Sequence, residues 1–320
     1  MAASQTPLLE YNKVTLMMGS RFEIIAVSSD SLAAAEAIDA GYHEINRIEQ
    51  LISSWLPHSQ TSKINNMAGK AGVKVSKELY DLIYRSLKVS ALTNGAYDIS
   101  FAGMEPLWKF DGQEVYRFPD SARLAKAAQI ANYKKILLNS AKSTVFLAEP
   151  GMKIGFGSIG KGYAANQAMS VMKAFGINSG MVNAGGDLIT WGKNKEGKAW
   201  SIGIADPNAK DQMFAWLSIQ DMALVTSGDY EKYFIYRNER YGHILDPRTG
   251  YPSKGIKSVS ILCQDVELAD ALATAVYVMG EQKGMALIDQ LNGIEGLIIT
   301  EDDQVLQSKN LVLQYYSIQD

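Results

Sequence analysis

The sequence predicts an α+β fold: a single domain with mixed, mainly antiparallel sheets and flanking helices. Runs rich in β-branched and aromatic residues alternate with amphipathic segments, but without the regular strand–helix–strand rhythm of a doubly wound α/β protein. The chain has 320 residues, of which 47% are apolar and 20% charged, enough for a substantial core. Because no linker or internal repeat interrupts it, we expect one domain over residues 1–320, with residues 1–12 as a flexible segment.

The first half is expected to begin with a β-hairpin and to continue mainly as helices. Ile38, Tyr42 and Ile45 recur at helical spacing, and Asp30 offers a cap at the start of that helix. The stretch after this helix is polar and reads as a loop that carries Trp55. The predicted elements are a hairpin over 14–27, helices over 31–53, 78–93 and 121–131, and a second hairpin over 136–147.

The second half is expected to hold a glycine-dense turn, a helix and then mostly strands. A strand starting at 222 should stop at the turn-forming run that begins with Thr226, and residues 238–241 read as a turn. The predicted elements are helices over 163–175, 267–279 and 283–291, and strands over 200–205, 213–219, 222–225, 230–236, 259–263, 296–300 and 311–315.

Composition excludes several classes of function. The net charge is −3 with both signs mixed, so the chain has no basic field for nucleic acid. The single Cys263 excludes an internal disulfide framework and lies in an apolar run, which is typical of a buried, inert thiol. The chain has no run of 18 apolar residues, so the sequence predicts no membrane span. The first residues lack the apolar core of a secretory signal. We expect either a cytosolic protein or the trimmed form of an exported one.

The glycine-dense turn of residues 155–162 resembles an anion site. Glycines let backbone N–H groups approach a ligand closely, and the helix that follows points its positive end at the turn. Lys161 adds a full charge, so phosphate is the expected guest. Gly162 replaces the Ser or Thr of the phosphate loop of nucleotide-binding proteins, and the acidic residue of a dinucleotide fingerprint is missing. A turn that only packs a helix on a sheet remains the alternative.

Asp270 and Thr274 lie four residues apart on an apolar helix and therefore share one face. A carboxylate and a hydroxyl are hard oxygen ligands that suit Mg²⁺ together with substrate phosphates. The alternative is that Asp270 caps a loop and Thr274 bonds back to a carbonyl. His243 precedes a compact turn and is a candidate proton acceptor near neutral pH, or else a histidine that only bonds loop backbone.

Four further residues have weaker individual signals. Trp55 and Met18 would form flat or flexible walls for a ring system. Asp98 would accept N–H bonds from a heterocycle, and the run from Thr226 would hold phosphate oxygens.

Taken together, these segments resemble the ApbE family, the FAD:protein FMN transferases, over nearly the whole chain and in the same order. The motifs that carry the resemblance are Met18-Gly-Ser-Arg-Phe22, Leu51-Ile-Ser-Ser-Trp55 with Ser59 and Ile64-Asn65, Gly95-Ala-Tyr-Asp-Ile99 with Pro106-Leu-Trp108, Gly157-Ser-Ile-Gly-Lys-Gly-Tyr-Ala165, Val182-Asn-Ala-Gly-Gly-Asp187, Thr226-Ser-Gly-Asp-Tyr230, His243-Ile-Leu-Asp-Pro-Arg-Thr-Gly250 and Ala269-Asp-Ala-Leu-Ala-Thr274.

The resemblance implies an enzyme that binds FAD and Mg²⁺, transfers FMN to a threonine or serine hydroxyl of a partner protein and releases AMP. It implies that His243 and Lys161 are catalytic and that Asp270, Thr274 and the backbone carbonyl of Ser158 hold the metal. The residues implied to contact FAD are Met18, Trp55, Ala96, Tyr97, Asp98, Lys161, Thr226 and Ile244. The acceptor would be a subunit of a membrane redox complex or a similar protein.

Three departures from the family pattern bear on FAD affinity and on the balance between transfer and hydrolysis. Gly155 and Asn166 stand where many members carry an acid, and Trp55 stands where tyrosine is frequent. An Mg²⁺-dependent FAD pyrophosphatase and a non-catalytic FAD-binding lipoprotein therefore remain alternatives. The resemblance also implies a periplasmic or lipid-anchored protein on the outer side of the membrane, although this chain has neither a signal segment nor a lipobox cysteine.

Overall fold

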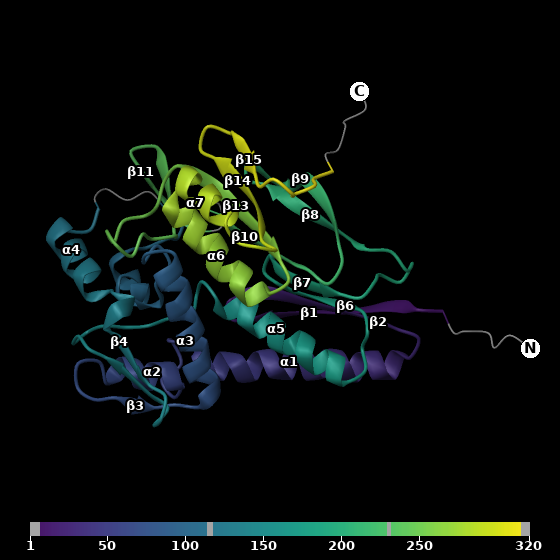
Figure 1. Ribbon diagram of the computed structural model, residues 1–320, viewed down its shortest axis with the longest axis horizontal. Coiled ribbons are helices and arrows are strands. Elements are labelled where there is room, and N and C mark those ends of the chain that lie inside the picture. The colour runs from purple at the N-terminus through teal and green to yellow at the C-terminus, as the bar shows by residue number, and fades with distance from the viewer. Residues whose placement is uncertain (1–6, 114–117, 229–231, 315–320) are drawn as a thin grey trace, which may run out of the picture.

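The computed structural model describes residues 7–113, 118–228 and 232–314. Its central element is an eight-stranded antiparallel sheet in the order β1-β2-β6-β7-β10-β13-β14-β15 (Figure 1). The strands of this sheet are β1 (Leu9–Met17), β2 (Ser20–Ser28), β6 (Gly180–Ala184), β7 (Asp187–Trp191), β10 (Ala223–Gly228), β13 (Ile256–Cys263), β14 (Glu295–Thr300) and β15 (Val305–Gln307).

Successive side chains of a strand point to opposite faces of the sheet, and both faces of this sheet carry apolar residues. Ile24 of β2 belongs to a cluster with the helices, whereas Val27 of the same strand belongs to a separate cluster with the β8–β9 hairpin. Helices therefore cover one face of the sheet and the hairpin covers the other. The covering elements are α1 (Ser31–Ile52), α5 (Gly160–Ala174), α6 (Val266–Met279) and α7 (Glu281–Ile288) on one face, and β8 (Trp200–Asp206) with β9 (Ala209–Ile219) on the other.

The remaining elements lie beside the helical layer at one end of the sheet (Figure 1). They include a satellite core in which Trp108 stacks on Phe234 at 5.6 Å between ring centroids. These elements are α2 (Gln60–Asn66), α3 (Lys77–Leu92), α4 (Ser121–Ile130), the 3₁₀ helices η1 (Ile99–Gly103), η2 (Glu105–Leu107) and η3 (Tyr133–Lys135), the strands β3 (Val73–Lys74), β4 (Ile136–Asn139) and β5 (Thr144–Leu147), and the hairpin of β11 (Tyr233–Tyr236) and β12 (Glu239–Gly242).

The expected α+β class with mainly antiparallel sheets is confirmed, and several local predictions are corrected. Strand β1 begins at Leu9, inside the segment expected to be flexible, while residues 1–6 lie outside the described residues. The predicted polar loop contains helix α2, because Ser59 caps it by accepting a 2.9 Å bond from the Ser62 N–H. Residues 239–242 form strand β12, since the turn lies earlier, at Arg237 and Asn238, both with positive φ.

Two strand ends also differ from the prediction. Strand β10 continues through the run from Thr226 to Gly228, because pairing with β13 satisfies its backbone. The closing strand is β15 at Val305–Gln307; in the predicted stretch from 311, Gln314 forms only an isolated bridge with Trp216, and residues 315–320 are not described. Within the described residues, no helix has both the length and the apolar character needed to cross a bilayer.

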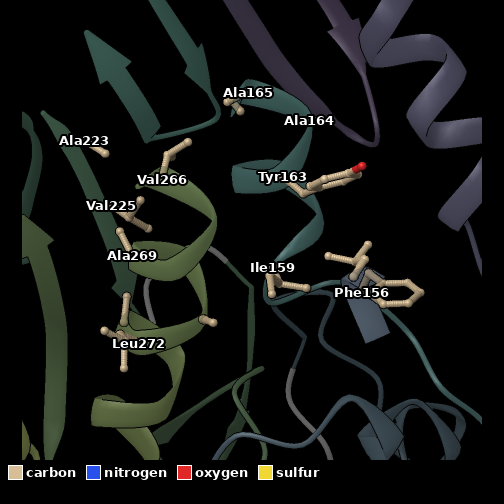
Figure 2. Packing of buried hydrophobic residues seen from close by; sticks show 14 of the residues in the cluster. Phe156, Ile159, Tyr163, Ala164, Ala165, Ala223, Val225, Val266, Ala269 and Leu272 are labelled. Carbon is tan, nitrogen blue, oxygen red and sulfur yellow. The ribbon is translucent and has the colours of Figure 1, made fainter. Parts of the chain in front are cut away.

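Helices α5 and α6 cross at a very short distance, and this crossing positions the site. A Cβ on Gly162 would lie 2.3 Å from the carbonyl oxygen of Val266, so only glycine fits there. Figure 2 shows this region, where Ala269 and Leu272 of α6 face the β10 residues Ala223 and Val225. Glycine at residue 162 therefore allows α5 to pack closely against α6.

Candidate active site

A cavity of about 700 Å³ opens where the glycine turn, the β1–β2 hairpin, the end of β10 and helix α6 meet. Its walls come from segments that are far apart in the sequence. All twelve residues singled out from the sequence line it, namely Met18, Trp55, Ala96, Tyr97, Asp98, Ser158, Lys161, Thr226, His243, Ile244, Asp270 and Thr274. The structure thus gathers the predicted residues around one space, and their individual roles stay predictions.

Asp270 connects helix α6 to the first turn of α5. Helix α5 begins at Gly160, earlier than predicted, and has no side-chain cap of its own. Instead, the N–H of Gly162 donates a 3.0 Å bond to Asp270 Oδ2. The alternative in which Asp270 caps a loop is therefore partly right, since its carboxylate caps a helix across the interface. One turn further along α6, Thr274 Oγ1 lies 3.5 Å from Ser227 Oγ and lines the same cavity.

The charges in this corner do not balance. Asp187 and Asp270 are both buried, at 1% and 4% exposure, and burial raises the pKa of each. Lys161 Nζ lies 2.8 Å from Asp187 Oδ2, and the proximity of Asp187 raises the pKa of Asp270 further. Within the described residues, no cationic side chain forms an ion pair with Asp270 at 4.0 Å or less. Two buried carboxylates share one ammonium, so a divalent cation fits the donor set.

His243 is neutral in this environment. Its Nδ1 is buried without a hydrogen-bond partner among the described residues, and its backbone N–H donates to the Lys232 carbonyl at 2.9 Å. Burial lowers the pKa of His243 to about 4, helped by the positive charges of Lys232 and Lys161. An imidazole that is unprotonated at neutral pH is in the form that accepts a proton.

Two apolar residues at the cavity mouth are placed for contact with a flat ligand. Trp55 is 81% exposed although it is large and aromatic, which leaves its ring available. Met18 adopts a positive φ of 50° in the β1–β2 turn, a conformation that few side chains favour. A Cβ on Gly160 would lie 3.7 Å from Met18 Cε, so this methionine borders the start of α5.

Other predicted contacts already have protein partners. Asp98 is buried and accepts bonds from the Ser100 N–H and hydroxyl and from the Tyr133 N–H, at 2.6–2.8 Å. Its carboxylate therefore anchors η1, while Asp98 also lines the cavity, so its role of binding a heterocycle's N–H stays a prediction. Thr226 Oγ1 lies 2.8 Å from Ser260 Oγ across the sheet. Asp229 and Tyr230, which belong to the same motif, lie outside the described residues.

Sequence reasoning gave no individual role to Asp187 or Glu105, which both line the cavity. Asp187 is the last residue of a glycine motif, and a carboxylate directly after two glycines is a pattern that can indicate a binding site. Glu105 precedes Pro106 at the start of a 3₁₀ helix, and burial raises its pKa. Nothing in the local pattern around Glu105 indicates a site.

The structure gives a physical reason for two of the departures from the family pattern. A Cβ on Gly155 would lie 2.9 Å from Ala102 Cβ, so a carboxylate there would require the η1 wall to move. Asn166 Nδ2 donates a 2.7 Å bond to Asp265, which caps α6. An acid at residue 166 would instead place two carboxylates together.

Known proteins are similar to this chain in sequence over most of its length. Residues 18–298 match the ApbE family. Among curated relatives, the FAD:protein FMN transferase of Treponema pallidum (strain Nichols) is 31% identical over 95% of this chain and 88% of its own length. A protein of the same name from Klebsiella pneumoniae (strain 342) is 29% identical over 95% and 94%.

Solved structures are similar over the same extent. The ApbE protein of Thermotoga maritima superposes with a TM-score of 0.87 at 32% identity, covering 94% of this chain and 97% of that one. The flavin transferase ApbE of Vibrio cholerae gives a TM-score of 0.80 at 26% identity, covering 95% and 98%. With this match in sequence and fold, the chain belongs to the ApbE family.

Proposed function

We propose that this chain is an FAD:protein FMN transferase, which moves FMN from FAD to a hydroxyl group of a partner protein and releases AMP. One observation carries the proposal: a cavity of dinucleotide scale is lined by the buried carboxylates of Asp187 and Asp270, the ammonium of Lys161 and the neutral imidazole of His243. Such a set binds a cation and a phosphorylated ligand together. The names of the related proteins support the same activity.

The pyrophosphate of FAD is proposed to lie against the start of α5. Lys161 and the N-terminal end of this helix supply positive potential at that point. The side chains of Asp270 and Thr274 and the carbonyl of Ser158 would hold Mg²⁺, which neutralises phosphate charge when bound. Met18 and Trp55 would enclose the isoalloxazine ring.

The transfer step requires a proton acceptor and an in-line path. The hydroxyl oxygen of a threonine or serine bonds to the phosphorus of the FMN half, and the bond from this phosphorus to the bridging oxygen breaks. AMP leaves with that oxygen, and His243 takes the hydroxyl proton. Lys232 and Lys161 depress the pKa of His243, so the negative charge of bound phosphates opposes this effect and makes the imidazole a stronger base once FAD is present.

Product analysis separates the transferase from its alternatives. The protein is incubated with FAD and Mg²⁺, with and without a threonine-bearing acceptor protein, and the products are analysed by mass spectrometry. A flavin–protein adduct together with AMP supports the transferase, whereas FMN and AMP without adduct indicate a pyrophosphatase. FAD that stays bound and intact refutes catalysis. EDTA and the Asp270→Asn variant serve as controls for the metal requirement. The membrane redox-complex acceptor, the location outside the cytoplasm and the single-domain organisation stay predictions.

A further inference from the structure

A second hollow, of about 290 Å³, lies on the other side of the 3₁₀ segment that borders the active-site cavity. Three cationic side chains line it: Arg123 and Lys126 from helix α4, and Lys153 from the stretch before the glycine turn. All three residues are exposed. The hollow is therefore a concentrated positive patch on a chain whose net charge is −3.

These cations lack anionic partners. Within the described residues, none of the three side chains forms an ion pair within 4.0 Å or a hydrogen bond, whereas nearby Lys135 pairs with Glu149 at 2.9 Å. The carboxylate of Asp120 is close in sequence, but it accepts a bond from the backbone N–H of Arg123, at 3.0 Å, as the cap of α4. Glu105 interacts with Lys153 only through space, since the lysine lowers a pKa that burial raises. Within the described residues, no ion pair at 4.0 Å or less compensates the positive charge of the hollow.

The hollow is close to the expected position of the pyrophosphate. Ser100 and Gly103 of η1 line the hollow, while Phe101 of the same turn lines the active-site cavity. Lys153 precedes Gly157 of the glycine turn by four residues, and such a segment spans at most about 14 Å even when fully extended. A polypeptide held in the hollow would have a neighbouring segment within reach of the transferred phosphoryl group.

We propose that this hollow docks an acidic segment of the acceptor protein and so helps to bring its hydroxyl group to bound FAD. The proposal rests on the proposed function, because only a transferase needs a polypeptide acceptor. FAD would fill the larger cavity, so the acceptor must contact residues outside it. Three cations without ion-pair partners attract carboxylates over a range of about 8 Å at physiological salt and orient the approaching chain.

Direct binding tests the proposal without relying on turnover. A fluorescein-labelled decaglutamate peptide is titrated with the FAD-loaded, metal-free protein, and anisotropy is measured at low and physiological salt. Replacing all three cations by glutamine should weaken binding about tenfold, as expected for the loss of three exposed charge pairs. A matched variant keeps the same charge change away from both cavities and should change affinity less than about twofold. The test variant is Arg123→Gln, Lys126→Gln and Lys153→Gln; the control is Lys193→Gln, Lys283→Gln and Lys309→Gln.

The other outcomes overturn the proposal. Equal binding of the peptide to the test and control variants would mean that only net charge matters. No binding to the unmodified protein at low salt would remove the site. Displacement of the peptide by equimolar inorganic phosphate would mean that the hollow takes a free anion instead of a protein segment. A failed transferase assay would show no flavin–protein adduct, with or without release of AMP, while leaving the anisotropy result intact, so the two failures are distinguishable.

Discussion

Replacing Gly162 by alanine should damage the metal site through helix packing alone. The new Cβ would lie 2.3 Å from the Val266 carbonyl oxygen and 2.9 Å from Asp270 Cβ. Because Cβ contacts below 3.0 Å essentially do not occur, α5 and α6 must separate by about 0.7 Å. This movement lengthens the bond from the Gly162 N–H to Asp270 and displaces the carboxylate from the cavity.

The magnitude follows from two opposing effects. Overpacking of a tight interior contact costs about 1–3 kcal/mol. Alanine in a helix is favoured over glycine by about 0.5–1 kcal/mol, which offsets part of this cost. The net loss of stability is expected to be about 1–2 kcal/mol. Mg²⁺-dependent turnover of FAD should fall at least about tenfold, because the displaced Asp270 carboxylate loses about 1.4 kcal/mol or more of its interaction with the metal.

Urea unfolding and a magnesium titration of FAD turnover measure the two effects. Gly72→Ala is the control, since its Cβ would lie 3.7 Å from Phe146 Cβ in ordinary contact and Gly72 does not line the cavity. This control should retain wild-type magnesium dependence. Wild-type stability and magnesium dependence in Gly162→Ala would refute the argument that the close helix crossing positions Asp270.

Three further predictions concern single side chains of the cavity. Asp270→Asn should abolish magnesium-dependent turnover yet leave the metal-free protein at least as stable at pH 8, because it removes a buried carboxylate whose pKa is raised; thermal unfolding with and without Mg²⁺ checks this. His243→Gln should lower kcat by about 10²–10⁴ with FAD affinity nearly unchanged. Folding lowers the pKa of His243 from 6.5 to about 4, so on acidification the unfolded chain takes up a proton at this histidine before the folded protein does. The free energy of unfolding should therefore be unaffected by this group above pH 6.5 and should fall by about 3 kcal/mol as the pH drops towards 4. Urea unfolding of the variant, followed against pH, should lack this decrease. Trp55→Ala should change the free energy of unfolding by less than about 0.5 kcal/mol but weaken FAD binding about tenfold, as measured by flavin fluorescence, and equal affinity would remove Trp55 from the flavin wall.

Local sequence patterns predict secondary structure correctly where the residues of a segment themselves decide its conformation. The helix from Ser31 was predicted with its Asp30 cap, because amphipathic spacing and a capping side chain act within a few residues. The same patterns missed helix α2 and the extension of β10. There the outcome depends on which partner satisfies the backbone.

For the candidate site, sequence alone determined the residue types: a glycine turn with Lys161, an acid and a hydroxyl one helical turn apart, and an isolated histidine. Tertiary structure decided what those groups can do. It placed Asp187 beside Lys161, left Asp270 without an ion-pair partner within the described residues, and gave the Asp98 carboxylate hydrogen bonds from the Ser100 and Tyr133 N–H groups. Charge balance and burial depend on which distant segments pack together, and no spacing along a single chain encodes them.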